Sequence, residues 1–118
     1  MIVLLATLAT LASPPIGLTV RYDDAAGRAH RATLTCRGER ARATGWLARS
    51  PVRACRRARK LPAPPPQGAI CTQVYGGPQR ARITGRVGSR RIDRALKRTD
   101  GCRIDEWDRM VPLVPRVG

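Results

Sequence analysis

The chain of 118 residues predicts a small α+β domain. We expect an antiparallel sheet of four to five strands, one main helix packed on one face, a short C-terminal helix and two disulfides. Three observations lead to this fold. Apolar and polar residues alternate in paired short runs, one segment repeats its apolar residues every three positions, and the cysteines number four. Aromatic residues make up only 3% of the chain, so crosslinks would help a core built from small aliphatic side chains.

The chain begins with an apolar run from Ile2 to Ala12 that carries no charge. It is too short to span a bilayer, and it resembles the apolar region of a secretory signal, with small residues where a peptidase could cut after Ala12. The basic residues that usually precede such a region are absent, so a buried N-terminal strand is the alternative. We therefore expect a signal peptide at 1–12, one domain at 13–118, no membrane span, and a secreted, extracellular protein.

Two pairs of alternating runs predict two antiparallel hairpins. Residues 17–22 and 29–36 flank a turn marked by two aspartates and Gly27, and residues 79–87 and 90–98 flank the turn at Gly88. Each run has one apolar face, on which a helix can dock. Such a half-apolar sheet could also support a homodimer.

The main helix is expected to begin at Ser50, as N-cap, with Pro51 at its first position. Its buried face should hold four residues at every third position, from Val52 through Cys55 and Ala58 to Leu61, before the proline run at 62–66 ends it. Residues 37–45 are expected to form a polar loop. Apolar residues at helical spacing after position 103 predict the short C-terminal helix.

The net charge of +15 comes mostly from 21 arginines, against two lysines. Clustered arginine can neutralise phosphates, but a GC-biased genome that uses arginine on solvated faces gives the same composition. No aromatic residues accompany the basic runs, as binding of single-stranded nucleic acid would favour. Nucleic acid is therefore not the expected partner. A basic extracellular module that binds an anionic polymer or nucleic acid remains the alternative function.

The cysteines are Cys36, Cys55, Cys71 and Cys102, which allow three disulfide pairings. Pairing in sequence order would tie the second strand to the helix, and the 68–79 loop to the end of the last strand. A zinc site is disfavoured because no two cysteines are closely spaced and the only histidine is His30.

No catalytic, metal or cofactor site is expected, and an enzyme is unexpected. His30 has no catalytic motif around it. The acidic residues Asp105, Glu106 and Asp108 are more simply explained as a solvated face or as partners for arginine.

Residues 68–79, GAICTQVYGGPQ, form a segment bounded by prolines and glycines and expected to be an ordered loop. It holds Ile70, Val74 and Tyr75, which are unusually apolar for a passive linker. An exposed apolar loop with a covalent anchor is typical of a binding element.

The run CTQVYGGP at 71–78 precedes a strand with Gly85, a turn at Gly88, a basic strand and TDGC at 99–102. This order resembles the Streptomyces subtilisin inhibitor family, secreted actinobacterial inhibitors of serine proteases. The cysteines at 36 and 55 match in order as well, and the likeness covers about residues 17–107. The chain differs in having Gly76-Gly77-Pro78 where the family usually has Asp-Pro, in Val87 where the family's hairpin has tryptophan, and in its C-terminal residues.

The resemblance implies serine-type endopeptidase inhibitor activity, with the scissile bond at Gln73–Val74. The remaining loop residues would be Cys71, Thr72, Tyr75, Gly76 and Gly77, and a Cys71–Cys102 disulfide would hold the loop in shape before it binds. The implied partner is an extracellular serine protease. We expect a subtilisin-like target rather than a trypsin-like one, because Gln73 would leave the carboxylate of a trypsin-type pocket unpaired.

Overall fold

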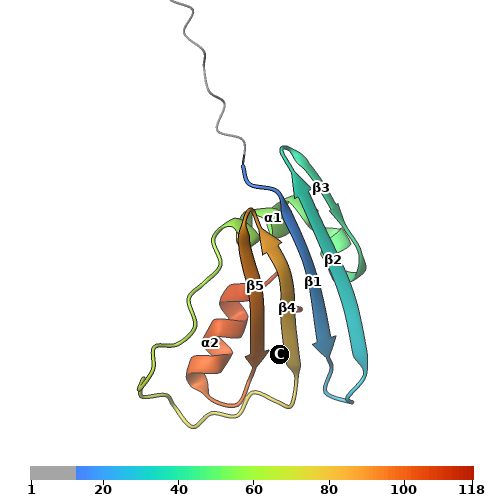
Figure 1. Ribbon diagram of the computed structural model, residues 1–118. Coiled ribbons are helices and arrows are strands. Elements are labelled where there is room, and N and C mark those ends of the chain that lie inside the picture. Colours follow the sequence, from blue (N-terminus) through green and yellow to red (C-terminus); the bar gives the residue numbers. More distant parts are fainter. Residues whose placement is uncertain (1–12) are drawn as a thin grey trace, which may run out of the picture.

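The computed structural model describes residues 13–118, so the predicted signal peptide at 1–12 lies outside the described residues. It confirms the α+β class: a five-stranded antiparallel sheet in the order β3-β2-β1-β4-β5 with both helices on one face (Figure 1). In chain order the elements are β1 (Ile16–Asp23), β2 (Ala29–Arg37), β3 (Arg40–Ala43), the 3-10 helix η1 (Gly45–Arg49), α1 (Pro51–Arg59), β4 (Arg80–Val87), β5 (Arg90–Lys97) and α2 (Gly101–Met110).

Both predicted hairpins are confirmed, as β1–β2 and β4–β5, and β1 joins them by pairing with β4. Alternation places the apolar side chains of each strand on the inner face, where Val20, Ala32 and Ile83 have no exposed surface. His30 shares the inward-facing parity of Ala32 and Leu34 but lies at the edge of the core, opposite Tyr22. Its side chain is half exposed at the end of β2, where Nε2 lies 2.8 Å from Asp24 Oδ2 and lowers the pKa of Asp24.

Helix α1 lies on the inner face with Ala54, Cys55 and Ala58 buried, and Cys55 is joined to Cys36 of β2. Pro51 occupies the first turn as predicted. The expected burial of Val52 is wrong, since that side chain is 54% exposed. Ser50 stands at the N-cap position, but its side chain makes no capping hydrogen bond.

The expectation of a polar loop at 37–45 is wrong, because β3 and the start of η1 lie within it. The alternating Arg and Ala residues of β3 extend the sheet beyond β2, with Ala41 opposite Cys36 and Ala43 opposite Leu34. Leu47 of η1 is fully buried in the core. A short edge strand of this kind is stabilised by pairing with its neighbour, so its own residues give little signal.

The predicted C-terminal helix is present as α2, and it buries Trp107 and Met110. The residues after it also belong to the core, since Leu113 and Val114 are fully buried. Two indole groups hold this tail by hydrogen bonds to its carbonyl groups: Trp46 Nε1 donates to Leu113 and Trp107 Nε1 donates to Pro115.

The acidic residues of α2 are partners for arginine, one of the two roles expected for them. Glu106 is buried, and its carboxylate accepts hydrogen bonds from Arg94 at 2.8 Å and from Arg103 at 3.2 Å. Arg94 also donates to the carbonyl of Pro62 at 2.6 Å, so this group ties β5, α2 and the start of the long loop together.

We expect Glu106→Gln to destabilise the fold by about 2–4 kcal/mol, because it removes the charge that compensates Arg94 in a largely buried position. The unfolding temperature should fall by about 10 °C or more. The matched control is Asp105→Asn, whose partner Arg109 and own carboxylate are both exposed. That change should alter stability by less than about 1 kcal/mol. Equal unfolding midpoints for the two variants in urea would contradict this prediction.

The four cysteines form two disulfides, Cys36–Cys55 and Cys71–Cys102, as the fold prediction required. Disulfides in a small compact domain are compatible with an extracellular protein. Over residues 13–118, no helix combines the length and the apolar character needed to cross a membrane.

Candidate functional site

The segment between α1 and β4 is the longest stretch without a helix or strand in the described chain, covering residues 60–79. Figure 1 shows it passing along the outside of α2 before it enters β4. Its apolar residues point away from the core: Ile70 is 100% exposed, Val74 57% and Tyr75 65%. Irregular loops of this length inside a compact domain are uncommon, and they are usually either functional or linkers.

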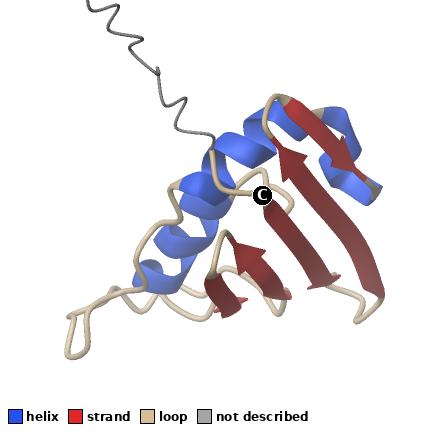
Figure 2. Ribbon diagram, turned by 45° about the horizontal axis from the view of Figure 1, so that its top comes forward, coloured by secondary structure: helices blue, strands red, loops and turns tan. Residues whose placement is uncertain are grey.

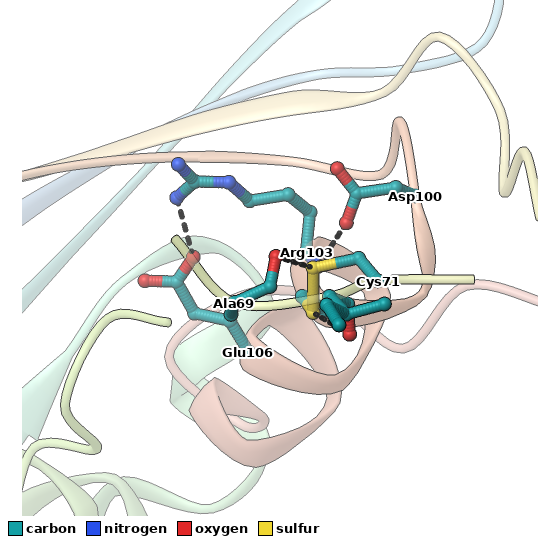
Figure 3. The surroundings of a disulfide bond; sticks show 7 residues. Ala69, Cys71, Asp100, Arg103 and Glu106 are labelled. Carbon is teal, nitrogen blue, oxygen red and sulfur yellow. Dashed lines mark hydrogen bonds and ion pairs between the residues drawn. A yellow bond between two sulfur atoms is a disulfide. The ribbon is translucent and has the colours of Figure 1, made fainter. Parts of the chain in front are cut away.

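The first anchor of the loop is the Cys71–Cys102 disulfide, which joins it to the first turn of α2 with a Cα–Cα distance of 5.3 Å (Figure 3). Beside it, Gly101 N–H donates to the Thr72 carbonyl at 2.9 Å. A Cβ atom at Gly101 would collide with the Thr72 hydroxyl, so glycine allows this close approach. Asp100 caps α2 by accepting from Arg103 N–H at 3.0 Å, which fixes the helix end that carries the anchor.

The second anchor lies at Gly76. Its N–H donates to the Arg98 carbonyl at 2.8 Å, and its own carbonyl accepts from Arg98 Nε at 3.3 Å. The backbone of Gly76 packs so closely that a Cβ atom there would come within 2.8 Å of the Ile104 side chain. Glycine at position 76 therefore lets the loop lie directly on α2 and the end of β5.

Arg98 is a buried cation, with 6% of its surface exposed. Besides the loop carbonyl, its guanidinium contacts Asp108 at 3.3 Å and lies over the ring of Trp107, 5.6 Å from the centroid. Both contacts are with α2, so Arg98 links the loop to this helix and to the buried Trp107.

Gln73, Val74 and Tyr75 thus form a short exposed span between two anchors, both of which lie on residues 98–102. No hydrogen bond between backbone groups involves these three residues in the described structure. Their amide and carbonyl groups are free to pair with the edge of another protein's strand. The two anchors also hold the chain on either side of the Gln73–Val74 bond independently of that bond.

The residues predicted for the loop, Cys71 to Gly77, make up the exposed span and its two anchors. Arg98 was not predicted. The sequence does contain a signal for it. Position 98 continues the alternating inward-facing positions of the last strand, where Ile92 and Leu96 are buried. An arginine at the end of a row of core-facing positions indicates that its charge has a specific partner in the fold.

One cluster of potential metal-ligating residue types occurs in the part of the chain that the structure describes, formed by Cys71, Asp100 and Cys102. Its two sulfur atoms are bonded to each other, and metal binding by cysteine needs thiolates. A four-cysteine zinc site likewise does not fit the two disulfides.

Comparisons of the chain with protein-family models, curated proteins and solved structures give no match.

Proposed function

We propose that the protein is a secreted inhibitor of serine proteases that offers the Gln73–Val74 bond as a substrate-like target. The observation that carries the proposal is the exposed span of Gln73 to Tyr75 between two anchors on residues 98–102. The order of residues at 71–78 and 99–102, which resembles the Streptomyces subtilisin inhibitor family, supports the same function.

The inhibitory mechanism follows from this geometry. A protease binds its substrate as an extended strand along an edge of its cleft, and the unpaired backbone at 73–75 can make those hydrogen bonds. Because the loop is fixed before binding, little conformational entropy is lost on docking. If the Gln73–Val74 bond is cut, the disulfide holds the Gln73 side and the Arg98 contacts hold the Val74 side. The new ends stay close, and religation competes with release.

Gln73 favours a subtilisin-like target. A trypsin-like pocket contains a carboxylate that needs a basic side chain, and a neutral amide leaves that buried charge without a partner. A broad, mainly apolar pocket accepts glutamine with a smaller loss of binding energy. The rival interpretation is a surface loop, pinned by its disulfide, that has no protein target.

The test is to titrate the oxidised protein, residues 13–118, against subtilisin and against trypsin, and then to sequence any new N-terminus. We expect inhibition of subtilisin at near-stoichiometric ratios, weaker inhibition of trypsin, and slow appearance of a terminus that starts at Val74. Rapid cleavage elsewhere in the loop, or no effect on either protease, would overturn the proposal.

We expect Arg98→Met to weaken inhibition about tenfold or more, because it removes a charge-assisted hydrogen bond to the loop carbonyl of Gly76 while keeping the apolar stem over Trp107. The cleaved fraction at equilibrium with subtilisin should rise, since the Val74 side is held less firmly. Asp108→Asn is the control, because it weakens the other contact of Arg98 and leaves the loop contact intact. Equal inhibition by the two variants, at matched thermal stability, would show that Arg98 is structural only.

A further inference from the structure

The outer face of the sheet is strongly basic. Both helices lie on the inner face, and within residues 13–118 no helix covers the outward side chains of the five strands (Figure 2). Ten of these outward side chains are cationic and two are carboxylates, Asp23 and Asp93, which gives this one face a net charge of +8. The ten are Arg21, Arg31, Arg37, Arg40, Arg42, Arg80, Arg82, Arg86, Arg91 and Lys97.

The carboxylates balance few of these cations. Arg82 is paired with Asp93 through two 2.9 Å hydrogen bonds, and Arg21 lies 3.4 Å from Asp23. The other eight basic side chains have no carboxylate within 4 Å among residues 13–118. The hydrogen bonds from Arg82 lower the pKa of Asp93, and the charges of Arg82 and Arg91 act in the same direction.

The register places like charges directly opposite one another. Arg31, Arg21 and Arg82 form one row across β2, β1 and β4, and Arg86 faces Arg91 across β4 and β5. The backbones of neighbours in such a row are about 5 Å apart, and like-charged side chains placed directly opposite one another destabilise a sheet unless an anion lies between them. Such a face is expected to bind anions.

Threonines lie between the arginine rows. Thr33, Thr19 and Thr84 stand opposite one another in the next row of the sheet, half buried among the longer basic side chains. Arginine together with threonine hydroxyls is the usual set of side chains that contact phosphate oxygens. At the end nearest the loop, the face is hollowed by a depression of about 550 Å³ with Arg21, Arg80 and Lys97 in its lining.

We propose that this face binds a linear phosphodiester polymer that carries no bases, of the kind found in cell envelopes. No outward position of the five described strands is aromatic, so stacking of nucleic-acid bases has no platform there. Self-association through this face would bring two surfaces of +8 together, which disfavours a second copy as the occupant. Bound in this way, the protein would be retained at an anionic surface while its loop stays available.

The test measures binding of the oxidised protein to poly(glycerol phosphate) between about 50 and 300 mM NaCl. The variant is Arg42→Gln, Arg86→Gln and Arg91→Gln, three residues of one row without carboxylate partners. Arg86 is six residues along β4 from the loop end, about 20 Å away. The matched control removes three exposed charges from the helical side, by Arg53→Gln, Arg56→Gln and Lys60→Gln.

We expect the face variant to bind more weakly and to lower the slope of log K against log salt by about 2. The helix variant should bind like the parent protein, and both variants should inhibit subtilisin like the parent. Equal losses in the two variants would overturn the proposal, because bulk charge would then explain the binding. No binding at the lowest salt would overturn it too. So would tighter binding to oligo(dT) or to polygalacturonate, or a dimer of the free protein in sedimentation.

Discussion

Replacing Cys71 and Cys102 together by serine is expected to convert the proposed inhibitor into a substrate. Without the bridge, the Gln73 side of the loop keeps only the hydrogen bond from Gly101 to Thr72, and several loop residues regain backbone freedom at about 1–2 kcal/mol each. Inhibition of subtilisin should therefore weaken by roughly 100-fold or more. Cleavage at Gln73–Val74 should become fast, because the new ends now separate before they rejoin.

The control for this prediction is the double replacement of Cys36 and Cys55. The two disulfides close loops of similar length, with sequence separations of 31 and 19, so each removal should lower the unfolding free energy by about 3–4 kcal/mol in the loop-closure model. Only the replacement of Cys71 and Cys102 should affect inhibition, when inhibition is measured at a temperature at which both variants are folded. Parallel loss of inhibition in the two variants would mean that the bridge acts on the fold rather than on the loop.

The sequence predicts best those elements whose buried residues recur at a regular spacing. Both hairpins follow from alternation, and α1 follows from spacing by three, because each burial pattern repeats within a few residues. β3 alternates as well, but over only four residues and with alanine as its inward residue, and the tail at 111–118 has no such period. β3 is held by its partner strand, and Leu113 and Val114 are buried because two indole groups hold the tail across the core.

The candidate site likewise has one part that the sequence predicts and one part that it does not. The sequence predicts an exposed loop with a covalent anchor, since proline, glycine and cysteine are local signals. The second anchor depends on a contact between Gly76 and Arg98, 22 residues apart, and on their packing against Ile104. No local pattern encodes that contact. Only the presence of arginines at the inward positions of β5 indicates that the strand has polar partners in the core.

Placing lysine at position 73 is expected to give the protein a new target. A lysine ammonium would pair with the buried carboxylate of a trypsin-like pocket, and leaving such a charge unpaired costs about 3–5 kcal/mol. Gln73→Lys should therefore improve trypsin inhibition by about two to three orders of magnitude. Inhibition of subtilisin should change far less, because a broad pocket can accommodate the lysine stem while the ammonium reaches solvent.

Gln67→Lys is the matched control, because it adds the same charge to the same exposed segment outside the anchored span. Inhibition constants for both proteases, measured with both variants, separate a specific contact from a general effect of charge. If Gln67→Lys improves trypsin inhibition as much as Gln73→Lys does, the effect is electrostatic attraction rather than occupation of the pocket. If Gln73→Lys changes neither constant, residue 73 does not enter the protease pocket, and the contact must be made elsewhere on the loop.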